Sequence, residues 1–204
     1  MKPFASRLPL TVREAVNWNR KAGPQRKTLI VLHCMQWPTK LDSAEWCGKF
    51  FAGALDPDPK TLKVPAAPMA SANFCVDGDS VVQCVPAEMW AYHAPGANPQ
   101  GIGVEHPGFV AWSRAQWLAP KSAAALAMGA RLVAELAMHF QIPCEFLDAD
   151  DVRAKLSGIT THEQVAIAFP EKNPHPHKDP GLGFPVRDYL DRVRGYTSNA
   201  WAEV

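Results

Sequence analysis

The chain has 204 residues, of which 47% are hydrophobic and 20% are charged, and this composition fits one globular domain with a sizeable core. Its 21 basic and 20 acidic residues give a net charge of +1, so the overall charge indicates neither a nucleic-acid partner nor a membrane surface. The most apolar stretch, Ser122–Phe140, contains Arg131 and Glu135, which excludes an integral membrane segment.

The first half of the chain is predicted to be rich in strands. Thr28–Cys34 is apolar and β-branched almost throughout, which is typical of a strand buried on both faces. Asp42 offers an N-cap for an amphipathic helix over 43–51, and four prolines predict a long loop over 52–68. Three further strand-like runs follow, the first two joined by a hairpin turn: Ala72–Asp77, Ser80–Val85 and Gln100–His106.

The second half is predicted to be mainly helical. Apolar residues recur at helical spacing from Pro120 to Gln141, whereas His139 belongs to the opposite, polar face of that helix. A short helix over 149–155 is expected to be capped by Gly158, and a last amphipathic helix spans Pro185–Arg194 with proline at its start. Because strands and helices alternate along the chain, the predicted fold class is α/β in a single domain.

The predicted domain covers residues 28–194, with a basic extension over residues 1–27 and a short tail over residues 195–204. No uninterrupted apolar segment follows the basic residues, so a secretory signal is not expected. Whether the extension helps the protein to reach an anionic envelope is left open. The five cysteines form no C-x-x-C pair and are interpreted as reduced packing residues.

Three segments that are far apart in the sequence place metal-ligand residue types where a strand ends or the chain turns. His33 ends the strand 28–34, His162 follows the short run 158–161, and Asp179 stands directly before a Pro-Gly turn. Two imidazoles and a carboxylate form a ligand set that suits zinc with an open fourth position for water. Each histidine taken alone is more often a structural residue, so spacing alone does not decide between the two interpretations.

Six motifs occur in a fixed order along residues 28 to 194. They are Leu-Ile-Val-Leu-His33-Cys34, Ser71-Ala72-Asn73-Phe74, Trp90-Ala91-Tyr92-His93-Ala94 with Asn98, Gly101-Ile-Gly-Val-Glu105, Thr161-His162 and His177-Lys178-Asp179-Pro180-Gly181. In this order they resemble the zinc-dependent N-acetylmuramoyl-L-alanine amidases, the type 2 amidase and peptidoglycan-recognition fold.

The resemblance implies a central mixed sheet flanked by helices, with long proline-rich loops around a groove that holds one zinc ion. It implies His33, His162 and Asp179 as the ligands, with water in the fourth position, where the metal charge lowers the pKa of that water toward about 7. Glu105 matches the catalytic glutamate of the family, which accepts a proton from the attacking water and passes it to the departing amine.

His177 lies where many members of the family place a lysine that holds the oxyanion, whereas here the next residue, Lys178, carries the charge. Because successive side chains of an extended segment point to opposite sides, His177 is expected to share a side with Asp179, and Lys178 to face away. We therefore predict His177 as the oxyanion donor, in a form that resembles phage amidases. Whether Lys178 takes that role instead is left open.

Four residues are predicted to contact the substrate in the groove: Trp90, His93, Asn98 and Asn73. A structural role is the alternative for His93, and Asn73 stands where many members of the family have histidine. Alternation along the strand is expected to turn Cys34 away from the metal. Three other histidines match no position of the family: His106, His139 and His175.

The resemblance implies hydrolysis of the amide between N-acetylmuramic acid and L-alanine in bacterial peptidoglycan, and we expect a monomer. A phage-type endolysin is the favoured interpretation, made in the cytoplasm of the producing bacterial cell without a signal peptide and reaching the cell wall with the help of a holin. Two alternatives are left open. One is a cytoplasmic wall-recycling amidase that acts on soluble anhydro-muropeptides, and the other is a peptidoglycan-recognition module that binds without cleaving.

Overall fold

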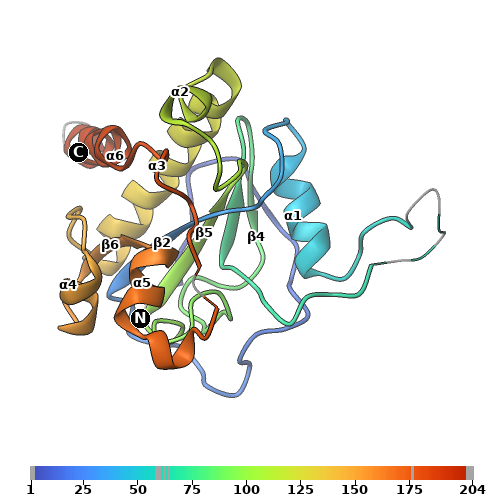
Figure 1. Cartoon of the computed structure of the whole chain (residues 1–204), viewed down its shortest axis with the longest axis horizontal. Helices are drawn as coiled ribbons and strands as arrows, with labels where there is room; N and C mark the ends of the chain where they lie inside the picture. The colour runs from blue at the N-terminus through green and yellow to red at the C-terminus, as the bar shows by residue number, and fades with distance from the viewer. Residues whose placement is uncertain (1–2, 58–60, 62, 64, 176, 201–204) are drawn as a thin grey trace.

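The computed structural model describes residues 3–57, 61, 63, 65–175 and 177–200, and strands in these parts of the chain form one six-stranded sheet (Figure 1). The strand order is β1-β4-β3-β5-β2-β6, and neighbours are parallel except in the β3–β4 hairpin. The strands are β1 (Leu10–Val12), β2 (Leu29–Cys34), β3 (Phe74–Val76), β4 (Val81–Gln83), β5 (Gly101–His106) and β6 (Gly158–Thr161).

Helices cover both faces of the sheet, which confirms the predicted α/β class with a mixed sheet (Figure 1). Helices α3 and α6 pack together on one face, whereas α1 and α5 lie on the other. The helices are α1 (Ser43–Phe51), α2 (Arg114–Trp117), α3 (Pro120–Phe140), α4 (Ala149–Arg153), α5 (His162–Ala168) and α6 (Val186–Ala200), with a 3₁₀ turn at Pro170–Lys172.

The strand β2 shows how the sheet positions polar residues at its end. All six residues of β2 are buried, and they alternate between two cores. Even-numbered residues pack with α3 and α6, whereas residues 29 and 31 pack with α5. His33 continues the odd-numbered series, and Glu105 of β5 lies opposite it in register. Both side chains therefore lie on the α5 face, at the carboxyl end of two parallel strands.

The amino-terminal residues take a larger part in the fold than the sequence predicts. Leu10–Val12 forms the edge strand β1, where no strand is predicted. Ahead of it, the Ser6 hydroxyl donates a hydrogen bond to Glu135 of α3. His139, predicted to lie on an exposed polar face of α3, is half-buried because the ring of Phe4 packs against it with centroids 5.5 Å apart. The polar face of α3 is thus partly covered by the chain itself.

The predicted helix 43–51, the hairpin, the strand at 100–106 and the long helix from Pro120 are confirmed, whereas short elements differ. The predicted helix 149–155 ends at Arg153, and Lys155 adopts a left-handed φ of 61°. Gly158 begins β6 and does not cap a helix. The helix predicted to end at Arg194 continues to Ala200. The short elements α2, β6 and α5 are not predicted.

Helix α3 is long and apolar enough, by length and composition, to cross a membrane. Half of its most apolar window is buried inside the protein, where it packs against β3, β5 and α6. Arg131 and Glu135 occupy the middle of the same helix. This packing is that of a core helix of a globular domain.

Candidate active site

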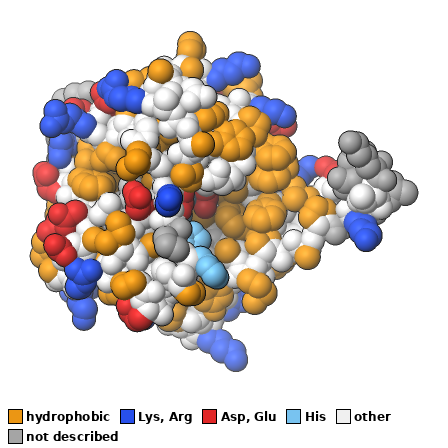
Figure 2. Space-filling model, viewed as in Figure 1, with side chains coloured by type: hydrophobic (Ala, Val, Ile, Leu, Met, Phe, Trp, Pro, Cys, Tyr) orange, Lys and Arg blue, Asp and Glu red, His pale blue; other side chains and the backbone are white. Residues whose placement is uncertain are grey.

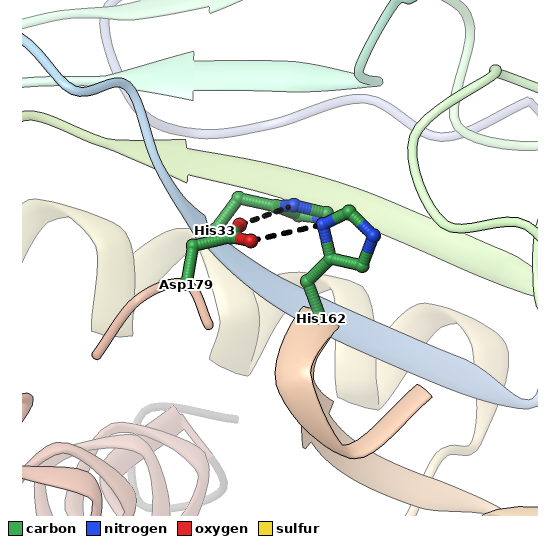
Figure 3. A group of neighbouring side chains, drawn as sticks. All are labelled: His33, His162 and Asp179. Carbon is green, nitrogen blue, oxygen red and sulfur yellow. Dashed lines mark hydrogen bonds and ion pairs between the residues drawn. The ribbon is translucent and has the colours of Figure 1, made fainter. Parts of the chain in front are cut away.

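Three side chains of metal-ligand type converge beyond the end of β2 (Figure 3). His33 comes from β2, His162 is the first residue of α5, and Asp179 comes from the loop that precedes α6. Oδ2 of Asp179 lies 3.0 Å from Nδ1 of His33, and Oδ1 lies 3.1 Å from Nδ1 of His162. The three ligand atoms lie within 4.8 Å of one another, so this group could hold a metal ion. The structure brings together the three residues that the resemblance implies as ligands.

The loop that carries Asp179 is tied down on both sides. The backbone N–H of Glu163, in the first turn of α5, donates a hydrogen bond to the carbonyl oxygen of Asp179 at 3.1 Å. Two residues after Asp179, Gly181 has a φ of 95° and lies so close to the Val110 backbone that a Cβ atom would be 2.2 Å from its carbonyl oxygen. Only glycine fits there without strain, so the turn that delivers Asp179 depends on it.

The two carboxylates of the site have opposite electrostatic environments. Burial alone would raise the pKa of Asp179, but hydrogen bonds from His162 and His33 outweigh it and hold that pKa well below its usual range. Oε2 of Glu105 is buried and finds no hydrogen-bond partner among the described residues. Burial, and then the charge of Asp179, raises the pKa of Glu105 to about 8. One carboxylate is kept ionised, and the other can carry a proton near neutral pH.

His93 holds the ring of His33 from the side away from Asp179. Its Nδ1 lies 3.0 Å from Nε2 of His33, and only 7% of the residue is exposed. Both ring nitrogens of His33 are therefore engaged, one toward the carboxylate and the other by a second imidazole. Burial and the neighbouring His33 lower the pKa of His93 well below its usual range, so this ring is neutral. His93 also borders the cavity described below.

Lys27 and Asn98 fix the segment that carries His93. The ammonium group of Lys27 is buried and donates hydrogen bonds to three carbonyl oxygens of this segment, those of residues 89, 99 and 101, at 2.8–3.0 Å. Oδ1 of Asn98 accepts from the backbone N–H groups of His93 and Ala94. Lys27, counted above in the basic extension, is thus an internal clamp. Asn98 holds the backbone of the same segment, and its contact with substrate stays a prediction.

A cavity of about 620 Å³ opens beside the three converging side chains, and Glu105 and His177 both border it (Figure 2). His177 is half-exposed, and its ring stacks on His162 with centroids 4.0 Å apart. Its Nδ1 lies 3.9 Å from Oδ1 of Asp179. Lys178, predicted to face away, borders the same cavity, because this segment is irregular and not a strand. Both candidate oxyanion donors therefore lie at the cavity.

One side of the cavity is apolar (Figure 2), and two of its residues, Trp46 and Phe50, are not predicted from the sequence. Trp46 and Phe50 of α1 border it with parallel rings, 5.8 Å apart and inclined by 4°. The indole of Trp37 stacks on that of Trp46, with ring centroids 3.9 Å apart. Tyr92 also borders the cavity. The spacing of four residues between Trp46 and Phe50 places them on one helix face, and this was the available signal.

Asn73 and Trp90, predicted to contact substrate, do not border the cavity. Asn73 is fully buried, and its amide bonds to backbone: Oδ1 accepts from Gly103, and Nδ2 donates to the carbonyl oxygen of Pro86. Trp90 is half-buried, and its ring N–H is enclosed without a partner in the described part of the chain. The prediction for Asn73 is corrected, because its side chain turns into the protein, whereas a substrate contact of Trp90 stays a prediction. Tyr92 and His93 of the same motif border the cavity.

All five cysteines are free thiols and serve in packing, as predicted. Cys34, Cys47, Cys75 and Cys84 are buried, and Cys144 is half-buried. Cys34 packs in the core with α3 and α6 and does not belong to the metal-ligand group, although it reaches the edge of the cavity.

The chain matches the model of one protein family, described as N-acetylmuramoyl-L-alanine amidase, over residues 23–182. No curated protein matches it. Among solved structures it is similar to the Staphylococcus aureus hydrolase AmiA in complex with its ligand, at 15% identity and a TM-score of 0.63 over 98% of this chain and 87% of that chain. It is also similar to AmpD, at 18% identity and a TM-score of 0.59 over 95% and 96% of the two chains. A mutant endolysin from Bacillus subtilis matches at 14% identity and a TM-score of 0.57, over 91% and 99%. At these identities the structural likeness shows a shared fold.

Proposed function

Because the chain belongs to the N-acetylmuramoyl-L-alanine amidase family and is therefore a peptidoglycan amidase, we propose that it is a zinc-dependent enzyme of the endolysin type. It hydrolyses the amide bond between N-acetylmuramic acid and the L-alanine of the stem peptide in the intact wall, which it reaches after release from the producing cell. One observation carries the metal-dependent hydrolysis in this proposal: the His33–His162–Asp179 group and the unpartnered Oε2 of Glu105 share one cavity.

His33, His162 and Asp179 fit one zinc ion. With one ligand atom from each residue, the three atoms lie within 4.8 Å of one another, so small movements of the side chains would bring them to the roughly 3.3 Å separation of atoms that lie about 2.0–2.2 Å from zinc in a tetrahedron. Three protein ligands leave one position open, as in catalytic zinc sites. Bound there, zinc supplies positive charge that polarises an amide carbonyl and acidifies water.

Glu105 is the residue that moves protons in this proposal. Its Oε2 is buried at the cavity without a hydrogen bond from any described residue, so it is free to accept the proton of the attacking water. Burial raises the pKa of this carboxyl to about 8 in the metal-free chain, and a cation beside it would favour the ionised form that can accept a proton. Once protonated by the attacking water, Glu105 can pass the proton to the departing amine of L-alanine. The same group thus serves first as base and then as acid.

His177 holds the oxyanion that forms when the amide carbonyl is attacked. Burial, and then the neighbouring His162, lowers its pKa, so the ring is neutral at neutral pH and still offers one N–H donor. Stacking on His162 fixes the plane of the ring beside the ligand group. Lys178 is the second donor available at the same cavity.

The test combines metal analysis with two substrates. Purified protein is assayed for new amino-terminal alanine on intact sacculi and on soluble anhydro-muropeptides, before and after chelation and with zinc restored. We expect one zinc per chain and release from sacculi that chelation abolishes and zinc restores. Activity confined to the soluble substrate contradicts the endolysin role and favours a recycling amidase. Full activity without metal contradicts the zinc dependence.

A further inference from the structure

His106 is a buried histidine that the proposed reaction does not use. It follows Glu105 in β5 and is 0% exposed, and its ring lies against Tyr189 of α6 on the opposite face of the sheet. Both of its ring nitrogens have partners: Nδ1 lies 3.2 Å from the carbonyl oxygen of His33, and Nε2 lies 2.9 Å from the hydroxyl oxygen of Tyr189. A buried hydrogen-bonded chain therefore runs from α6 to the backbone of His33.

The chemistry of these partners decides which nitrogen carries the proton. A carbonyl oxygen can only accept, so Nδ1 of His106 must donate to His33. In the neutral ring Nε2 is then an acceptor, and the hydroxyl of Tyr189, itself only 1% exposed, donates to it. Tyr189 thereby favours the tautomer in which His106 donates to His33.

The long helix makes room for this chain of hydrogen bonds. At Gly129 of α3, a Cβ atom would lie 2.3 Å from Nε2 of His106 and 2.9 Å from the hydroxyl of Tyr189. Glycine in a helix interior is unfavourable by about 1 kcal/mol relative to alanine. Elements that are distant in sequence, α3, α6 and β5, therefore meet at one imidazole.

The sheet leaves the end of β2 without full support at this point. The pairing of β2 with β6 ends at Leu32 with Thr161, so His33 has a paired strand only on the β5 side. On that side the ring of His106 adds a hydrogen bond to the carbonyl of His33, beyond the ladder that joins the two strands. The added bond acts on the residue whose side chain turns to the ligand group on the other face.

We propose that His106 is a positioning residue for the ligand His33, with Tyr189 orienting His106 from α6. The inference rests on the proposed function, because it takes His33 as a metal ligand. Partners that orient metal ligands contribute about 10-fold to 100-fold to metal affinity. Because His106 acts through the backbone of His33 and not through its ring, the lower end of this range is expected.

Two variants of His106 separate the two hydrogen bonds. In His106→Asn the amide nitrogen can take the place of Nδ1 and keep the donor to His33, whereas in His106→Gln the longer side chain reaches toward Tyr189 and loses that donor. Zinc affinity is measured by competition with a chelator, and the thermal stability of each metal-free variant is measured beside it. We expect His106→Gln to bind zinc about 10-fold more weakly and His106→Asn to bind close to wild type, at comparable stabilities.

If a His106 variant does not fold, Tyr189→Phe still tests the inference, because it keeps the packing of the ring and removes only the hydroxyl. Nitrogen NMR of the metal-free chain should show His106 with its proton on Nδ1 in the wild type and a weaker preference in Tyr189→Phe. A proton on Nε2 in the wild type, or equal zinc affinity in the wild type and both His106 variants, would overturn the inference. A wild-type chain that takes up no zinc contradicts the proposed function itself, so the two failures are told apart.

Discussion

The carboxyl ends of β2 and β5 carry polar side chains on both faces of the sheet, and the hydrogen bonding of buried polar atoms differs between the two faces. On the α5 face, three atoms are buried without a hydrogen-bond partner among the described residues: Oε2 of Glu105, Nε2 of His93 and Nε2 of His162. On the α3 face, both nitrogens of His106 are hydrogen-bonded. A buried polar atom without a partner costs free energy, and the residues that carry these three atoms border one cavity, where a ligand could offset that cost. The comparison separates a reacting face from a supporting face.

The largest effect is expected from removing the carboxylate that joins the ligand group. Asp179→Ala leaves both facing imidazoles without their shared partner, so zinc uptake and amide hydrolysis should both be lost. Metal analysis and the release of amino-terminal alanine measure the two effects. Asp188→Ala, an aspartate on α6 that pairs with Arg114 at the surface, is the matched control and should retain both. Full zinc occupancy in Asp179→Ala would refute the ligand assignment.

A change at Glu105 should separate turnover from metal binding. Glu105→Gln keeps the shape of the side chain but removes its proton transfer, so kcat should fall by about 10²–10⁴-fold while zinc is retained. Steady-state kinetics with metal analysis of the same sample check this. Glu145→Gln, a surface glutamate that pairs with Arg194, is the control. A kcat for Glu105→Gln within a factor of two of the control would rule out its role as base and acid.

Because His93 contacts the ring of His33, a substitution at His93 should lower the affinity of the ligand group for zinc. His93→Phe keeps a ring against Gly101 and Gly103 but removes the nitrogen 3.0 Å from His33, so zinc affinity should fall about 10–100-fold. Chelator competition measures the change. His139→Phe, on α3 against the ring of Phe4 and outside the ligand group, should leave affinity unaltered. Equal affinities in the two variants would show that His93 does not orient the ligand.

The unpartnered carboxyl of Glu105 also predicts a pH effect on stability in the metal-free chain. Its pKa is about 8 when folded and 4.5 ordinarily. The folded chain therefore binds more protons than the unfolded chain between these values, and the free energy of unfolding falls as pH rises from about 4.5 to 8. Relative to Glu105→Gln, the decline should be of the order of a few kcal/mol.

Urea unfolding of both proteins at four values of pH measures this difference. Addition of zinc should abolish the decline, because a cation beside Glu105 favours its ionised form. Parallel pH profiles for the wild type and Glu105→Gln in the absence of metal would disprove the electrostatic account of this residue.

The smallest effect concerns the supporting face and two helix glycines. Gly129→Ala forces a Cβ atom onto His106 and Tyr189, so it should destabilise the chain by about 1–3 kcal/mol despite the better helix propensity of alanine. At Gly195 of α6 no atom lies within 4 Å of an added Cβ, and Gly195→Ala should stabilise by about 0.5–1 kcal/mol. Thermal unfolding measures both stability changes. A change of the same sign in the two variants would contradict the close packing of Gly129 against His106.

Long elements could be predicted from the sequence because a continuous apolar run, or apolar residues at helical spacing, extends over enough residues to be recognised. The run 28–34 and the helix from Pro120 are examples. β1 and β6 could not be predicted in this way, since three or four residues show no period and only pairing with a neighbour makes them strands.

The candidate site also has residues that the sequence predicts and residues that it does not. Motif order predicts that His33, His162 and Asp179 meet, and the structure brings them together. It does not predict which side chains of a loop turn inward, so the fully buried Asn73 is misassigned. That choice depends on the backbone groups and side chains of other segments.

The central claim is that the reacting face holds one metal ion between His33, His162 and Asp179, and an anomalous difference map at the zinc absorption edge tests it most directly. Crystals of the zinc-loaded chain should show one peak about 2.0–2.2 Å from Nδ1 of both histidines and from an oxygen of Asp179. A fully loaded crystal with no peak there, or with its peak at the buried cysteines, would contradict the account.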